Sequence, residues 1–464
     1  MDTLIKNGKI VRSDKTFLAD ILISGERIIK IEENIECEDC KVIDAKGCYV
    51  FPGFIDTHTH FDLDTGFTKT SDDFNTGTKA AIMGGTTTIL DFATQDRGST
   101  LKKAFDVWTK KAEDNSFCDY GFHMAITEYN DYIEKEMEEI VEMGMPSFKL
   151  YMAYDALRVD DGCIYRALRR SKDIGAIIGF HCENGDIINA LTKESRERGE
   201  KTTYYHPRVK PAEIEGEATE RVIAIADMVK SPLYIVHVTC REALEKIERA
   251  KDKGIKVFGE TCPQYLLLDI SRYGDIDDKS FEGGKYVLSP PLRDKKNQDI
   301  LWEGIKNNII DFIGTDHCSF NFKGQKDIGI DDYSKIPNGI PGVEHRFYLM
   351  YTEGVMKNKI TLNKMVEILS SNGAKFFGMY PDKGEILEGS IADIVIYDPD
   401  ENWTISYKNQ YQNVDYTPYE GFNVSGKIKH VFLRGNHVVE DGNMIIEKPL
   451  GKFVKGKRFD YDRK

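Results

Sequence analysis

The sequence has no apolar run long enough to cross a membrane, and its first residues lack a basic segment followed by an apolar stretch. Neither end carries a block of like charges, and the formal net charge is -14. That charge disfavours binding to nucleic acid or to an anionic membrane surface. We therefore expect a cytoplasmic protein that has neither a membrane nor a nucleic acid as its partner.

The cysteines form no recognisable disulfide framework. There are nine of them, an odd number, scattered over 464 residues, which favours reduced thiols. Cys37 and Cys40 make a C-x-x-C pair, but no second pair and no thioredoxin-like context accompany it. A zinc or redox role is therefore not favoured there.

The chain is too long for one ordinary domain, which favours a large barrel with an accessory domain. Short strand-like runs separated by turns fill residues 1–50 and return after residue 385. Between them, eight strand-like runs alternate with helix-compatible segments, which favours a TIM-type (β/α)8 barrel. We predict an α/β fold with this barrel over residues 51–384. Residues 1–50 and 385–464 are predicted to form a small β-sandwich domain, with the C-terminal tail free to extend to a neighbouring subunit.

The predicted barrel strands are 51–60, 86–94, 120–127, 147–154, 175–183, 232–239, 256–266 and 311–319. The predicted helices are 78–83, 101–112, 132–143, 161–172, 217–229 and 242–251. In such a barrel the chemistry belongs at the carboxyl ends of the strands.

The first of these strands ends in His58 and His60. The period-two alternation of a strand puts both imidazoles on one face, which is a metal-chelating geometry. Any one of the later histidines alone would be interpreted as a buried packing residue. The matched position at strand ends instead favours metal ligands, and the further candidates are Lys149, His181, His237 and Asp316.

Lys149 is the unusual member of this set. An ammonium beside divalent metals would be repelled and poorly solvated. A neutral lysine amine can react with carbon dioxide, and the resulting carbamate would be an anionic ligand able to bridge two ions. The alternative is a lysine that extends to solvent at the barrel mouth.

Six stretches carry a resemblance to a known family: FPGFIDTHTH at 51–60, SFKLYMAY at 147–154, GFHCE at 179–183, TDHCSFNFKGQK at 315–326, IPNGIPGVE at 336–344 and VDYTPYEG at 414–421. The chain resembles, over essentially its whole length, the dihydropyrimidinase and hydantoinase family within the metal-dependent amidohydrolase superfamily. The resemblance implies two zinc ions per subunit, bridged by a hydroxide and by N6-carboxylated Lys149. It assigns His58, His60 and Asp316 to one ion, and His181 and His237 to the other.

The same resemblance implies ring opening of hydantoins, 5,6-dihydropyrimidines or both to N-carbamoyl amino acids, with the hydroxide as nucleophile. Asp316 would pass the hydroxide proton to the leaving ring nitrogen, and Tyr154 would donate its phenol to the oxyanion. Backbone groups of Ser289 and Asn338 would hold the ureide edge of the substrate ring. Similar enzymes are mostly homotetramers.

Three alternatives remain beside this hypothesis. Dihydroorotase is disfavoured because Asp62 stands where that enzyme has an arginine for the substrate carboxylate. An allantoinase-like hydrolase of another cyclic ureide has a similar barrel, and a noncatalytic scaffold would keep the fold but lose ligands. The loop at 61–67 departs from the commoner family form, so neither the hydantoin or dihydropyrimidine preference nor the stereoselectivity is carried over.

Overall fold

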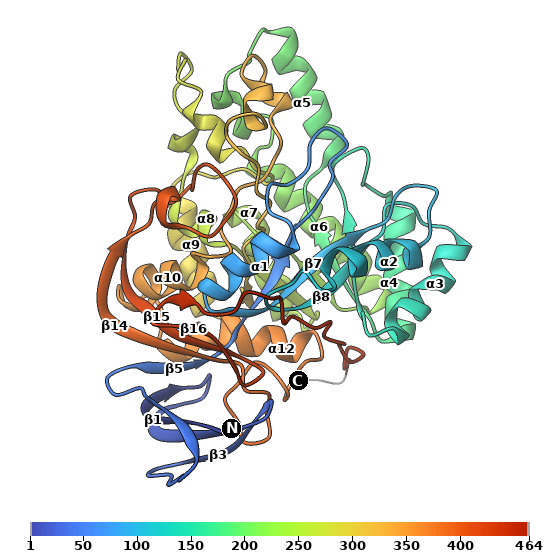
Figure 1. Ribbon diagram of the computed structural model, residues 1–464. Helices are drawn as coiled ribbons and strands as arrows, with labels where there is room; N and C mark the ends of the chain where they lie inside the picture. The colour runs from blue at the N-terminus through green and yellow to red at the C-terminus, as the bar shows by residue number, and fades with distance from the viewer. Residues whose placement is uncertain (1, 462–464) are drawn as a thin grey trace.

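The computed structural model describes residues 2–461, and a barrel of parallel strands occupies its centre (Figure 1). The strands follow one another around the barrel in sequence order, and a bridge between Thr59 and His317 joins the first strand to the loop after the last. The predicted barrel is confirmed. Its strands are β6 (Phe54–Thr59), β7 (Thr86–Thr94), β8 (Asp119–Ala125), β9 (Ser147–Tyr151), β10 (Ile177–His181), β11 (Leu233–Ile235), β12 (Val257–Thr261) and β13 (Phe312–Ile313).

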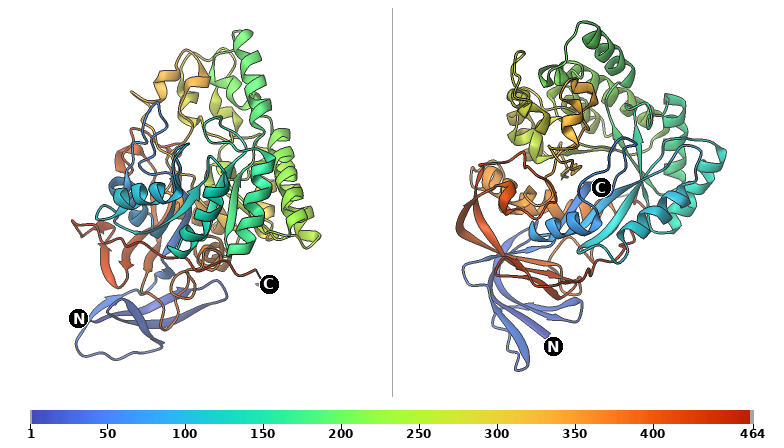
Figure 2. Two further views of the ribbon diagram at one scale, coloured as in Figure 1. Left: turned by 90° about the vertical axis from the view of Figure 1, so that its right-hand side faces the viewer. Right: turned by 45° about the horizontal axis from the view of Figure 1, so that its top comes forward.

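Helices surround the barrel on its outer side (Figure 2). Among the described residues, none of them combines the length and the apolar character that a membrane crossing requires. The helices are α1 (Phe74–Met83), α2 (Leu101–Ala112), α3 (Asp131–Glu142), α4 (Asp161–Ile174), α5 (Gly185–Glu197), α6 (Ala212–Val229), α7 (Arg241–Asp252), α8 (Pro263–Leu267), α9 (Lys296–Lys306), α10 (Arg346–Leu349), α11 (Leu362–Val366) and α12 (Asn372–Phe376).

Two elements differ from those predicted. Helix α5 was not predicted although Ile187, Ile188 and Leu191 have helical spacing; it lies at the surface, with only Gly185 and Ser195 buried. The predicted strand 256–266 is wrong beyond Thr261, because Pro263 at the first helical position starts α8.

Strands from both chain ends form a second, nine-stranded mixed sheet. Strand β5 joins the two ends, since it pairs with β1 in parallel and with β14 in antiparallel orientation, and the chain continues from it into β6. The predicted small β domain from both termini is therefore confirmed. Its strands are β1 (Asp2–Val11), β2 (Thr16–Ser24), β3 (Arg27–Glu32), β4 (Cys40–Asp44), β5 (Tyr49–Pro52), β14 (Ile394–Thr404), β15 (Asn423–Leu433), β16 (Asn436–Glu440) and β17 (Asn443–Met444).

The described part of the C-terminal tail lies on the barrel of its own chain. Three backbone hydrogen bonds fix the tail. The N–H groups of Gly451, Gly456 and Phe459 donate to Ser116 O, Gly144 O and Gly175 O, each at 2.8 Å. Ser116 and Gly144 precede β8 and β9, so the tail covers the barrel end opposite the carboxyl ends of the strands.

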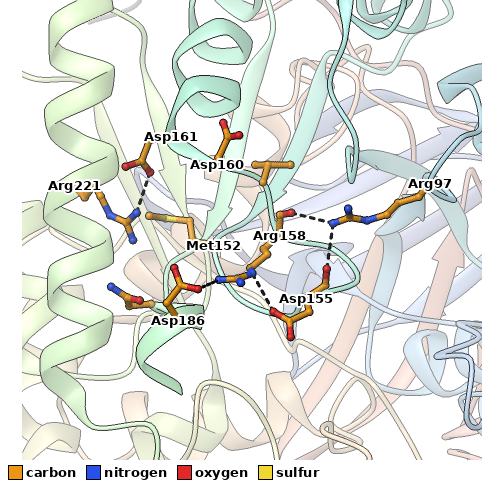
Figure 3. Close-up of a pocket in the computed structure, with 11 residues that line it drawn as sticks. Arg97, Met152, Asp155, Arg158, Asp160, Asp161, Asp186 and Arg221 are labelled. Atoms are coloured by element: carbon orange, nitrogen blue, oxygen red, sulfur yellow. Dashed lines mark hydrogen bonds and ion pairs between the residues drawn. The ribbon is translucent and has the colours of Figure 1, made fainter. Parts of the chain in front are cut away.

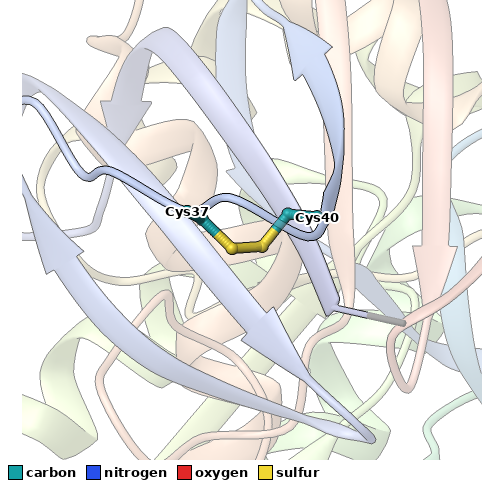
Figure 4. The surroundings of a disulfide bond; sticks show 2 residues. All are labelled: Cys37 and Cys40. Carbon is teal, nitrogen blue, oxygen red and sulfur yellow. A yellow bond between two sulfur atoms is a disulfide. The ribbon is translucent and has the colours of Figure 1, made fainter.

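Cys37, in the segment that connects β3 to β4, and Cys40, the first residue of β4, are joined as a disulfide (Figure 4). Their Cα atoms lie 5.8 Å apart, within the range that a disulfide spans. The expectation of reduced thiols is wrong for this pair, and it holds for the other cysteines of the described chain, all of which are free.

Candidate metal centre

The candidate ligands lie at the carboxyl ends of the barrel strands. His58 belongs to β6, Lys149 to β9 and His181 to β10, while His237 and Asp316 follow β11 and β13. Both His237 and Asp316 have a positive φ, of 38° and 52°, a backbone conformation that costs energy and is typical of functional sites. The structure therefore brings together, from distant parts of the chain, side chains able to ligate a metal.

One half of the site is centred on Asp316. Its Oδ1 lies 3.1 Å from His58 Nε2 and 3.3 Å from His60 Nε2. Burial opposes ionisation of this carboxyl, but the adjacent histidines outweigh it and hold the pKa of Asp316 well below its ordinary value. The carboxylate is thus anionic and shared between two imidazoles.

The other half is formed by His181 and His237. His181 Nδ1 lies 3.0 Å from His237 Nε2, and both side chains are buried. The ring of His237 also lies 5.4 Å from that of His58, between centroids. The two halves are therefore adjacent, and His58, His237 and Asp316 each offer a ligand atom within 4.8 Å of the others.

Lys149 points into the barrel between these halves. Its strand neighbour on β10 is Gly179, where an added Cβ would lie 3.1 Å from the Tyr234 ring. The ammonium is buried among the rings of Phe92 and Tyr151, and no described residue forms a hydrogen bond with it. Burial lowers the pKa of Lys149 to about 8, against the pull of Asp316 and Glu260. A buried, unpartnered amine of this kind is costly unless it is modified or bound.

Two glutamates behind the histidines were not predicted. Glu260 Oε1 accepts a hydrogen bond from His58 Nδ1 at 2.6 Å, and Glu183 Oε2 accepts one from His181 Nε2 at 2.9 Å. Each bond fixes the imidazole so that its other nitrogen presents a lone pair to the site. Glu183 was detectable, since it stands two residues after His181 and alternation directs both to one side; Glu260 gave only the weaker signal of an acid within a strand.

These residues fit a divalent metal. Lone pairs and carboxylate oxygens face one another at the centre, an arrangement that is repulsive unless a cation or protons lie between them. The same electrostatics appear in His58: burial alone would lower its pKa, but Glu260 and Asp316 raise that pKa to about 9. The donor set of imidazoles and carboxylate is the one that zinc prefers.

Two of the three expected substrate contacts, Tyr154 and Ser289, border the centre. The ring of Tyr154 lies 5.2 Å from that of His181, and burial raises the pKa of its phenol well above the ordinary value. Ser289 Oγ donates to Glu183 Oε2 at 2.9 Å and accepts from Lys210. The side chain of Ser289 is thus tied to the histidine network, beside the backbone role predicted for this residue. Asn338 Oδ1 is buried and accepts no hydrogen bond from any described residue.

Another histidine group lies on the β domain, where His430 Nδ1 is 3.1 Å from His437 Nε2 and Glu440 is adjacent. Here the Lys41 ammonium already binds His437 Nδ1 at 3.0 Å and Glu440 Oε1 at 3.3 Å. This group is therefore not a candidate metal centre. His206 is buried in a 3-10 helix, where its Nε2 donates to Leu288 O at 2.8 Å.

Comparison with known proteins agrees with this geometry. A model described as the amidohydrolase family matches residues 49–438. The D-hydantoinase of Geobacillus stearothermophilus is 46% identical over 461 residues, 99% of this chain and 97% of that protein. The D-hydantoinase of Streptomyces coelicolor is 43% identical over 460 residues, 97% of each chain. The solved structure of dihydropyrimidinase from Brevibacillus agri NCHU1002 has a TM-score of 0.97 at 45% identity and covers 99% of this chain and 100% of its own. The chain therefore belongs to the metal-dependent amidohydrolase family, among its hydantoinases and dihydropyrimidinases, and is a hydrolase that acts on cyclic amide bonds.

Proposed function

We propose that this hydrolase binds two zinc ions per subunit and opens the rings of hydantoins, 5,6-dihydropyrimidines or both to N-carbamoyl amino acids. The observation that carries the proposal is the buried, unpartnered Lys149 amine amid four histidines and Asp316. When bound, the two ions would lower the pKa of a shared water and polarise the substrate carbonyl. His58, His60 and Asp316 would hold one ion, His181 and His237 the other, and carboxylated Lys149 would bridge them.

Asp316 would move the proton. Its carboxylate is held ionised by His58 and His60, so it can accept a proton from the attacking water. Once protonated, it can donate that proton to the ring nitrogen as the amide bond breaks, a general base that becomes a general acid. The left-handed backbone at Asp316, with φ of 52°, is rigidly supported by the bond from His317 N to the Thr315 hydroxyl at 3.2 Å.

Tyr154 would stabilise the oxyanion, because its raised pKa keeps the phenol protonated and able to donate. We expect Tyr154→Phe to lower kcat by about 100-fold while KM and metal content change little, since one oxyanion donor is lost. Steady-state kinetics beside metal analysis check this. Retention of more than half of the wild-type kcat would exclude the assigned role.

The substrate is a cyclic ureide, and its substituent would meet the loop after β6. Phe67 on that loop is 95% exposed, which suits contact with an apolar substituent at the mouth. Asp62 on the same loop is a carboxylate paired with Lys69. This position therefore offers no cation that could bind an anionic substrate. Because the similar proteins are named D-hydantoinases, we infer a preference for D-5-monosubstituted hydantoins.

A substrate panel tests this function directly. The protein is assayed for ring opening of both enantiomers of a 5-monosubstituted hydantoin, of dihydrouracil and of allantoin. Turnover of the D-hydantoin or dihydrouracil supports the proposal. Turnover of allantoin alone would favour the allantoinase-like alternative, and absence of both bound metal and turnover would favour a noncatalytic scaffold. A homotetrameric assembly and a cytoplasmic location belong to the same proposal.

A further inference from the structure

Tyr154 stands at the start of a strained turn. Its φ is 69°, a left-handed conformation that is costly for a tyrosine. The turn is closed by the backbone N–H groups of Leu157 and Arg158, which both donate to Tyr154 O at 2.8 Å. The direction of the phenol therefore depends on how firmly residues 154–158 are held.

Arg97 holds this turn from the loop after β7. Its Nη2 donates to Asp155 O at 3.1 Å and to Arg158 O at 3.2 Å (Figure 3). Its Nε donates to Ala156 O at 3.0 Å. One guanidinium thus binds three carbonyls of a single turn. Only the planar, many-donor fork of arginine can do this, because a lysine ammonium is a point donor on a flexible stem.

Ring packing holds the Tyr154 end of the turn, since the Tyr154 ring lies 5.2 Å from that of His181 and 6.3 Å from that of Tyr151, but the rest of the turn faces open space. A cavity of about 650 Å³ borders it, and among the described residues Asp155 and Arg158 line that cavity while Tyr154 does not. Polar contacts restrain the remainder: Arg158 is paired with Asp155 at 3.0 Å and with Asp186 at 2.5 Å (Figure 3), and Asn189 Nδ2 donates to Asp155 Oδ1 at 2.9 Å. With open space beside it, the turn could shift if the polar restraints were weakened.

We propose that Arg97 is a positioning residue for Tyr154, which fixes the turn that aims the phenol at the reacting carbonyl. The inference rests on the oxyanion role proposed for Tyr154. Arg97 is itself exposed and contacts the backbone of the turn, so its removal leaves the barrel core and the metal ligands untouched.

Kinetics test the coupling between the two residues. We expect Arg97→Ala to lower kcat about tenfold, with a smaller change in KM and unchanged metal content, because loss of the clamp misplaces the phenol. In a Tyr154→Phe background the same substitution should cause no further loss, since the group that it positions is gone. Arg97→Lys should not restore kcat. Arg198→Ala is the matched control, because Arg198 is an equally solvent-accessible arginine that pairs with Glu200 rather than with the turn.

Amide hydrogen exchange supplies a readout that does not depend on activity. The Leu157 and Arg158 amides should exchange faster in Arg97→Ala than in the wild type, and should be unchanged in Arg198→Ala. Unchanged exchange in Arg97→Ala would overturn the proposal, as would the same kcat loss in both Tyr154 backgrounds. If the wild type opens no cyclic ureide but the Leu157 and Arg158 amides still exchange faster in Arg97→Ala, the proposed function is wrong while the contact of Arg97 with the turn is supported.

Discussion

Replacing Lys149 with alanine is expected to remove most of the bound metal and to lower ring-opening activity by about 1,000-fold or more. The reason is electrostatic. Lys149 is 1% exposed, and under the proposal its carbamate is the anion that allows two divalent cations to lie close together. Without that anion the cations repel each other, and the neutral imidazoles cannot compensate. Metal content and kcat/KM on a hydantoin are the measurements.

Lys149→Met separates this effect from a packing defect. Methionine fills a volume similar to that of lysine without an amine, so thermal unfolding of the variant should match that of the metal-free wild type, while metal and activity are lost as in Lys149→Ala. Lys193→Met is the matched control, because the Lys193 side chain is 78% exposed on α5. Full activity in Lys149→Met would rule out the carbamate.

Asp316→Asn should lower kcat by about 10,000-fold, the second large effect. Asparagine keeps the shape of the side chain and tolerates the left-handed φ of 52°, so the fold should not change. It cannot accept a proton, however, and it removes the negative charge between His58 and His60. Both the proton transfer and one metal ligand are therefore weakened. Each tenfold loss in rate corresponds to about 1.4 kcal/mol of activation free energy.

Single-turnover kinetics at saturating metal distinguish these two losses. If added zinc restores the metal content of Asp316→Asn but not its rate, the proton-transfer role stands. Recovery of more than a tenth of the wild-type rate under those conditions would mean that another group carries the proton.

The sequence was sufficient for the barrel and for the residues that meet at its mouth, because strand alternation and strand ends are local signals. Both ends of strand β7 (Thr86–Thr94) and of helix α2 (Leu101–Ala112) were predicted correctly. His58 and His60 share one face toward Asp316, as predicted. Strand β13 was predicted far too long, since only two of its residues pair with β12, and pairing is a tertiary property.

Other features could not be read from local pattern. The hydrogen bond from His58 to Glu260 joins residues 202 positions apart, and that from Arg97 to the Tyr154 turn spans about 60 positions. A contact of this kind is set by how the barrel brings its loops together. The Cys37–Cys40 disulfide likewise depends on a connection that places the two Cα atoms 5.8 Å apart, whereas the number and scatter of the cysteines favoured reduced thiols.

The most direct test of the account is the metal content of the active protein, measured by mass spectrometry on samples whose hydantoin turnover is determined in parallel. The account predicts two zinc ions per chain in the wild type, with activity that rises as the second site fills, and the loss of both in Lys149→Ala. A fully active protein with one ion per chain or none, or a Lys149→Ala variant that keeps two ions and full turnover, would contradict it.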